Sequence, residues 1–136
     1  MMNDKRIQEL LFLAEEARNR AYCPYSHYAV GAALLTGSGR IYQGCNIENA
    51  AYSPGVCAER TAFFQAIYDG EREFEAIAIL GSGETPSFPC GVCRQVMAEF
   101  CSGSFQIITG NRDKSIVITK TLDQMLPNSF GPKDLL

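Results

Sequence analysis

Residues 57–100 are predicted to form a helix, a strand and a second helix, and read CAERTAFFQAIYDGEREFEAIAILGSGETPSFPCGVCRQVMAEF. The first helix is expected to start near Cys57 and to end at Gly70, because glycine is favoured just past a helix terminus. Phe74 to Leu80 is a nearly continuous apolar run, which is typical of a strand covered on both faces. The second helix is expected from about Cys90 to Phe100. This succession predicts an α/β fold.

Before this stretch, the chain is predicted to form a helix and then a β-hairpin. The hairpin consists of strands from Tyr28 to Thr36 and from Arg40 to Asn46, joined by the tight-turn sequence Gly37-Ser38-Gly39. The helix, from about Asp4 to Ala21, is amphipathic, and its apolar residues recur at helical spacing: Ile7, Leu10, Leu11, Ala14 and Ala17.

After this stretch, strands are predicted from Phe105 to Thr109 and from Ser115 to Thr119, followed by a helical turn around Leu122 to Leu126. The connection from Gly110 to Lys114 is too short for a parallel crossover, so this pair should be antiparallel. The complete order is α-β-β-α-β-α-β-β, which predicts a three-layer α-β-α sandwich with a mixed five-stranded sheet. We expect residues 1–136 to form one domain.

Composition and charge argue against some classes of binding partner. The formal net charge of −3, without any run of Lys or Arg, argues against a nucleic-acid partner, because such proteins need a basic face. The N-terminus lacks the apolar core and cleavage site of a signal peptide, and no apolar stretch is long enough to cross a bilayer. We therefore expect a cytoplasmic protein that binds neither nucleic acid nor membrane.

The six cysteines divide into two groups. In a reducing compartment, metal binding or catalysis is the better default for a cysteine than a disulfide. Cys23, Cys45 and Cys101 stand among apolar or small neighbours and are expected to be small buried hydrophobes. The other group is Cys57, Cys90 and Cys93.

Cys57-Ala58-Glu59-Arg60 and Pro89-Cys90-Gly91-Val92-Cys93-Arg94 each open a predicted helix. A helix start presents free N–H groups and a positive partial charge, which favour the thiolate that binds metal. Right-handed winding of the β-α-β-α-β portion should bring both helix starts to one edge of the sheet. Three converging thiolates leave a fourth zinc position open, which is the catalytic arrangement.

Two other interpretations of these cysteines stay open on spacing alone. Cys90 and Cys93 have the spacing of a redox dithiol at a helix start, as in a thiol-disulfide oxidoreductase. A structural, non-catalytic zinc site would need a fourth ligand, for which His27 and Cys101 are the candidates.

The spacing of a zinc ligand, one residue, a glutamate and a later P-C-x-x-C is the signature of zinc deaminases. The chain resembles the cytidine and deoxycytidylate deaminase family, and within it the small, homotetrameric type with three cysteine ligands. The matching runs extend over nearly the whole chain: Pro24-Tyr25-Ser26, Val30-Gly31-Ala32-Ala33-Leu34, Asn46 to Tyr52, Cys57 to Arg60, Pro89 to Gln95, and Leu126-Pro127 with Phe130.

The resemblance implies one Zn²⁺ per subunit, held by Cys57, Cys90 and Cys93, and a homotetramer with shared active sites. It implies that Asn46 and Glu48 bind the sugar hydroxyls of a nucleoside substrate and that Ala58 also contacts the substrate. Two aromatic residues complete the site: Tyr28, where phenylalanine is usual, packs on the base and ribose, and Phe130 reaches into a neighbouring subunit's site.

Three thiolates leave a zinc site with net negative charge, which should weaken its power to acidify water. We expect the guanidinium groups of Arg60 and Arg94 to donate hydrogen bonds to the sulfurs and to withdraw charge.

The activity implied is hydrolytic deamination of cytidine and 2′-deoxycytidine to the uridines and ammonia, in pyrimidine salvage, with Glu59 as the catalytic proton carrier. The main alternative is an enzyme for another aminopyrimidine nucleoside, such as blasticidin S.

Overall fold

The computed structural model describes residues 2–136. The elements in chain order are α1 (Asp4–Arg18), β1 (Val30–Thr36), β2 (Ile41–Cys45), α2 (Ala58–Tyr68), β3 (Phe74–Gly81), α3 (Gly91–Phe100), β4 (Gln106–Gly110), β5 (Val117–Thr121), α4 (Leu122–Met125) and the 3₁₀ turn η1 (Pro132–Asp134). This is the predicted succession. No helix in residues 2–136 has the length and apolar character that crossing a membrane requires.

Several element boundaries differ from the sequence prediction by one to three residues, two of them for clear local reasons. α1 ends at Arg18 because the amides of Arg20 and Ala21 bond three residues back, which tightens the chain into a turn. β5 begins at Val117 because the Asn111 side chain binds the amide of Ile116 and closes the preceding turn.

The mixed five-stranded sheet of the prediction is confirmed, with the strand order β2-β1-β3-β4-β5. β1 pairs antiparallel with both β2 and β3, whereas β3 and β4 are parallel. The last pair, β4 and β5, is antiparallel, as the short connection predicted.

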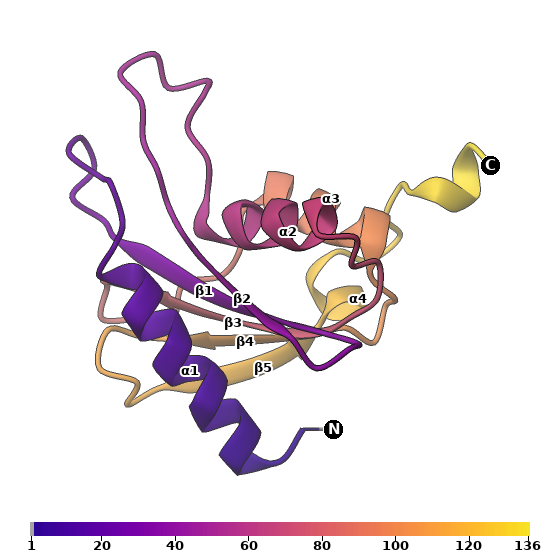
Figure 1. Cartoon of the computed structure of the whole chain (residues 1–136), viewed down its shortest axis with the longest axis horizontal. Coiled ribbons are helices and arrows are strands. Elements are labelled where there is room, and N and C mark those ends of the chain that lie inside the picture. Colours follow the sequence, from indigo (N-terminus) through magenta and orange to yellow (C-terminus); the bar gives the residue numbers. More distant parts are fainter. Residues whose placement is uncertain (1) are drawn as a thin grey trace.

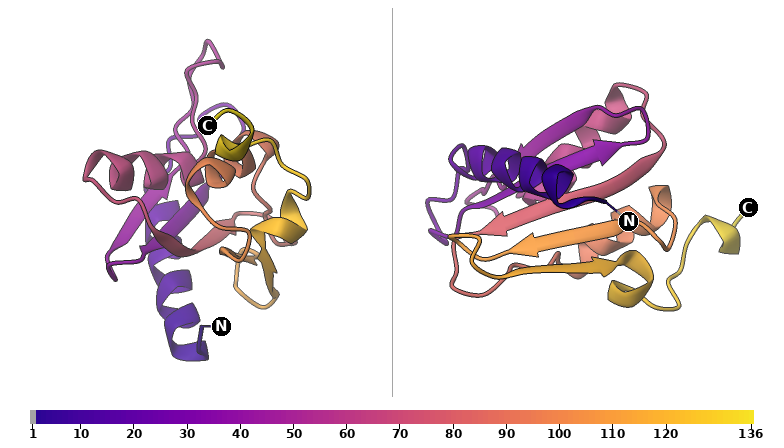
Figure 2. Two further views of the ribbon diagram at one scale, coloured as in Figure 1. Left: turned by 90° about the vertical axis from the view of Figure 1, so that its right-hand side faces the viewer. Right: turned by 90° about the horizontal axis from the view of Figure 1, so that it is seen from below.

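The sheet separates two apolar layers, as Figures 1 and 2 show, with α1 on one face and α2 and α3 on the other. Alternate residues of a strand point to opposite faces. In β1, Ala33 and Leu35 pack with the apolar side of α1, whereas Ala32 and Leu34 pack in the cluster that includes Phe63 of α2. The three-layer arrangement therefore follows from strands that are apolar on both faces.

Two glycines allow the helices to lie close to the sheet. A Cβ atom at Gly31 would collide with the backbone of α1 at Ala14 and Arg18, and one at Gly44 would collide with the backbone of α2 at Ala58. A residue without a side chain is therefore required at both positions.

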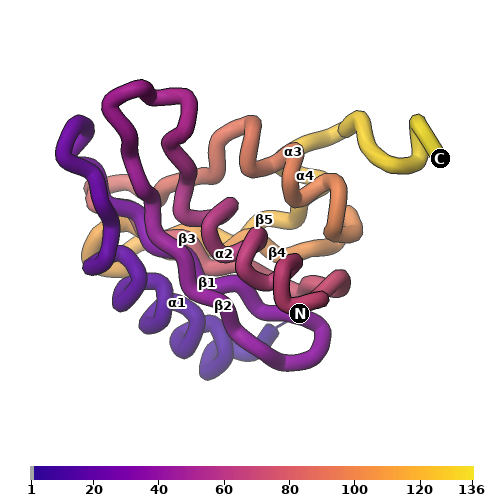
Figure 3. The backbone as a smooth tube through the Cα atoms, turned by 45° about the horizontal axis from the view of Figure 1, so that its top comes forward, coloured from indigo at the N-terminus to yellow at the C-terminus, as the bar shows by residue number. Residues whose placement is uncertain are grey.

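The topology brings two helix starts to one edge of the sheet. β2 and β3 both run antiparallel to β1, so their carboxyl ends meet at the same edge. The loops that leave them lead to Cys57 and Cys90 at the starts of α2 and α3. The segment between α1 and β1 and the loop between β2 and α2 extend side by side at this end of the molecule (Figures 1 and 3), joined by hydrogen bonds between Tyr22 and Asn46 and between Glu48 and Tyr22.

Candidate active site

Three cysteine sulfurs converge where α2 and α3 begin. Cys57 and Cys90 are the N-cap residues of these helices, with extended backbone and no side-chain capping hydrogen bond, so their sulfurs are available to a ligand. Cys93 lies in the first turn of α3 and is buried. The three Sγ atoms lie within 4.8 Å of one another.

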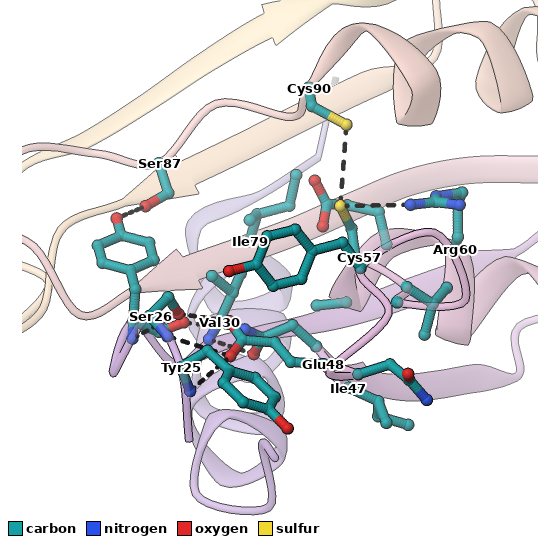
Figure 4. A pocket seen from close by; sticks show the side chains of 18 of the residues that line it. Tyr25, Ser26, Val30, Ile47, Glu48, Cys57, Arg60, Ile79, Ser87 and Cys90 are labelled. Atoms are coloured by element: carbon teal, nitrogen blue, oxygen red, sulfur yellow. Dashed lines mark hydrogen bonds between the residues drawn. The ribbon is translucent and has the colours of Figure 1, made fainter. Parts of the chain in front are cut away.

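This geometry fits a tetrahedral zinc ion. Zn–S bonds of about 2.3 Å at tetrahedral angles place two sulfurs about 3.8 Å apart. The Sγ atoms of Cys57 and Cys90 are 3.8 Å apart (Figure 4). In residues 2–136, neither His27 nor Cys101 belongs to the group of metal-ligating side chains, so the three-ligand arrangement with an open position is the one present.

The environment of the sulfurs favours thiolate at Cys57. The pKa of the Cys57 thiol is lowered to about 5, first by a hydrogen bond from Cys93 and further by Arg60, against an opposing effect of burial. The pKa of Cys93 is raised above its usual range, first because its thiol donates to Cys57 and then because it is buried. Cys57 is therefore the sulfur on which negative charge collects.

Of the two arginines expected at the sulfurs, the structure places only Arg60 there. Nη2 of Arg60 lies 3.6 Å from Sγ of Cys57 (Figure 4). The expectation for Arg94 is wrong, because its Nε donates to the Pro89 carbonyl at 2.7 Å and its Nη1 to the Met125 carbonyl at 2.7 Å. Arg94 directly follows Cys93 in α3, and its side chain points back to the preceding loop and to α4. Its hydrogen bonds join these two segments to the start of α3.

Glu59 is a buried carboxyl group in the wall of a cleft beside the sulfurs. Only 4% of its surface is exposed, and burial raises its pKa to about 7. Within residues 2–136, no side chain of another residue forms a hydrogen bond or ion pair with the Glu59 carboxylate; a hydrogen bond with its own backbone opposes the effect of burial and lowers its pKa.

The cleft has a volume of about 710 Å³ and lies between the loops at this edge of the sheet. Four of the five predicted substrate contacts line it, namely Tyr28, Asn46, Glu48 and Ala58. The cleft is also lined by residues for which no role was predicted, among them Tyr25, Ser26, Ser87 and Phe88. Tyr25 and Ser26 belong to one of the runs that resemble the family, whereas Ser87 and Phe88 carry no such signal and reach the cleft only through the folding of distant loops.

Asn46 and Glu48 hold the segment between α1 and β1. Asn46 accepts a hydrogen bond from the Val30 amide and donates one to the Tyr28 carbonyl, both at 2.9 Å. The Glu48 carboxylate accepts from the amides of Tyr25 and Ser26, both at 3.1 Å, and from the Ser26 hydroxyl (Figure 4). These bonds, first that from the Ser26 hydroxyl, lower the pKa of Glu48.

Phe130 lies outside the cleft of its own chain. Its side chain is 61% exposed, and its carbonyl accepts a hydrogen bond from the Gln95 side chain at 2.8 Å. In Figure 1 the segment that follows it extends away from the sheet to the C-terminus.

The remaining cysteines are less buried than expected. Cys23, Cys45 and Cys101 are all free thiols that keep some exposure, because each lies at the end of an element or in a loop near the surface.

Comparison with known proteins gives consistent matches. A family model described as "Cytidine and deoxycytidylate deaminase zinc-binding region" matches residues 4–109. A cytidine deaminase of Sporosarcina psychrophila is 50% identical over 129 residues, which are 95% of this chain and 94% of that protein. A cytidine deaminase of Halalkalibacterium halodurans is 44% identical over 128 residues, 94% of this chain and 96% of that protein.

A solved structure has the same fold. The crystal structure of cytidine deaminase from Burkholderia pseudomallei matches with a TM-score of 0.88 at 42% sequence identity, over 95% of this chain and 100% of that chain. The matched zinc-binding region contains the three cysteines, and together with their geometry it identifies a site for one zinc ion per subunit.

Proposed function

This chain belongs to the cytidine and deoxycytidylate deaminase family, and we propose that it converts cytidine and 2′-deoxycytidine to uridine and 2′-deoxyuridine with release of ammonia. The observation that carries the proposal is the buried Glu59 carboxyl in the cleft wall beside the three sulfurs. A role in pyrimidine salvage and a cytoplasmic location belong to the same proposal.

Zinc, when bound by the three cysteines, lowers the pKa of water toward neutrality and so supplies a nucleophile for C4 of the pyrimidine ring. The chain's own part is proton transfer. Glu59 takes the proton from the attacking water and transfers it to ring N3, which makes C4 more electrophilic. Glu59 then takes the second proton, from the hydroxyl group now on C4, and delivers it to the exocyclic amine; the C4–N bond breaks, the C4 carbonyl forms and ammonia leaves. Burial of Glu59 supports this role, because water does not compete for the carboxylate.

A nucleoside is the substrate class that the hydrogen bonding of the cleft supports. A carboxylate has about four acceptor positions. The loop occupies three positions of Glu48, two on Oε1 and one on Oε2. The side-chain amide of Asn46 donates one of its two hydrogens to Tyr28. Each side chain therefore keeps a position for a sugar hydroxyl, with the segment from Tyr25 to Val30 already ordered.

We propose that the enzyme is a homotetramer in which Phe130 enters the cleft of a neighbouring subunit. Phe130 is a large, exposed apolar side chain outside its own cleft, and Gln95 holds its backbone. Burial of such a side chain against a second copy is favourable.

The proposed activity is tested by incubating the purified protein with cytidine, 2′-deoxycytidine and blasticidin S, and following each reaction by absorbance. We expect conversion of the first two substrates, loss of activity with a zinc chelator and recovery when zinc is restored. Conversion of blasticidin S alone, or disulfide reduction in place of deamination, would contradict the proposal.

A further inference from the structure

The hydroxyl groups of Tyr28 and Ser87 share a hydrogen bond at the edge of the cleft (Figure 4). Tyr28 precedes β1, and Ser87 lies in the loop between β3 and α3, so the bond joins segments that are 59 residues apart in the sequence. A phenylalanine at position 28 could not form it. The contact is therefore specific to the tyrosine of this chain.

Two glycines make room for the tyrosine hydroxyl. A Cβ atom at Gly81 would lie 2.5 Å from Oη of Tyr28, closer than atoms can approach, and would also collide with Ser87. A Cβ atom at Gly83 would lie 3.3 Å from Oη and 3.4 Å from Cε1 of Tyr28. The hydroxyl thus occupies a notch that side chains at these two positions would fill.

The loop that carries Ser87 has few other anchors. Two hydrogen bonds hold its first part. The Ser82 hydroxyl donates to the Ala29 carbonyl at 2.6 Å, and the Glu84 carbonyl accepts from the Asn111 side chain at 3.0 Å. Its end is held at Pro89 by Arg94. For residues 85–88, the bond to Tyr28 is the one hydrogen bond found within residues 2–136.

We propose that the Tyr28–Ser87 pair is a latch that orients the aromatic ring for the nucleoside and holds residues 85–88 at the edge of the cleft. Both residues line the cleft, and the loop leads directly to the zinc ligand Cys90. The assignment of Tyr28 as a nucleoside contact rests on the proposed function. An unlatched ring and loop would have to be ordered on binding, at a cost in conformational entropy. Loss of the latch should therefore weaken substrate binding more than it slows the chemical step.

The test compares Tyr28→Phe, Ser87→Ala and the double variant with the wild-type enzyme. We expect each single change to raise KM for cytidine about five-fold, which corresponds to about 1 kcal/mol, the size of one neutral hydrogen bond. kcat should change less than KM. The double variant should resemble either single variant, because both remove the same bond. Tyr42→Phe is the matched control, since it removes a tyrosine hydrogen bond to Asp69 away from the cleft and should leave KM unchanged.

Amide hydrogen exchange of residues 85–88 supplies a readout that needs no activity. Exchange should be faster in Tyr28→Phe and Ser87→Ala, and unchanged in Tyr42→Phe. If wild-type protein deaminates no nucleoside, the proposed function fails and exchange alone decides whether the pair orders the loop. Unchanged exchange in both variants, or KM effects that multiply in the double variant, would overturn the latch.

Discussion

At the scale of single residues, identical side-chain types have different roles because their surroundings differ. Arg60 and Arg94 each follow a zinc ligand or catalytic position at the start of a helix. The side chain of Arg60 reaches a sulfur, whereas Arg94 is occupied by two backbone carbonyls. Of the two arginines, Arg60 is therefore the one for which we propose a charge-withdrawing role.

Replacing Glu59 with glutamine should abolish turnover and leave the fold intact. The amide has nearly the same shape but cannot accept and return a proton, so kcat should fall at least about a thousand-fold. Zinc content, measured by elemental analysis, should stay at the wild-type level. Substantial remaining activity with bound zinc would rule out Glu59 as the proton carrier.

Replacing Arg60 with glutamine should lower kcat about 10- to 100-fold, because the Cys57 sulfur loses its charge-assisted partner. Arg72→Gln is a suitable control, since Arg72 binds only backbone carbonyls beyond the far end of the same helix. Equal kinetics and zinc affinity for the Arg60 variant and wild type would exclude the charge-withdrawing role.

At the scale of elements, the site depends on how closely the helices approach the sheet. α2 lies directly on β2 at Gly44, and the N-cap of the same helix is the zinc ligand Cys57. α3 carries the other two sulfurs at its start. A small displacement of either helix would therefore change the distances between the ligands.

Gly44→Ala should destabilise the protein, because its methyl group would collide with the backbone of α2. We expect a loss of about 1–3 kcal/mol in the free energy of unfolding, measured by urea denaturation, together with weaker zinc binding. Gly91→Ala in α3 is the comparison, since a Cβ there meets nothing within 4 Å. A wild-type urea midpoint for Gly44→Ala would show that the helix can move away at no cost.

At the scale of the whole molecule, Phe130 is a large exposed apolar side chain outside the cleft of its own chain. The C-terminal segment extends from the body of the molecule (Figure 1). Assembly would bury Phe130 and close the cleft of a neighbour.

Phe130→Ala should weaken activity, and co-expression with Glu59→Gln subunits should restore part of it. A mixed oligomer contains sites with an intact Glu59 that receive Phe130 from the other kind of subunit. Activity of the purified mixed oligomer should therefore exceed the sum expected from the separate variants. Strict additivity would mean that Phe130 acts within its own subunit.

Local sequence patterns predicted the order of the elements and the mixed sheet and singled out the three cysteines, for which the resemblance to the family then favoured zinc over a redox dithiol. Apolar runs define strands, and thiols at helix starts have a characteristic spacing. Boundaries such as the end of α1 differ from the prediction because turns and side chains compete for the hydrogen-bonding groups of the backbone at the end of an element.

The side chains that meet across distant segments become known from the folded chain and not from the sequence. Arg60 stands three residues after the N-cap cysteine of α2 and Arg94 four residues after that of α3, and in the folded chain one reaches a sulfur and the other two backbone carbonyls. The Tyr28–Ser87 bond joins loops whose relative placement depends on strand order and on two glycines in contact with the tyrosine. Long-range contacts of this kind have no local sequence signal, because they depend on how the whole chain packs.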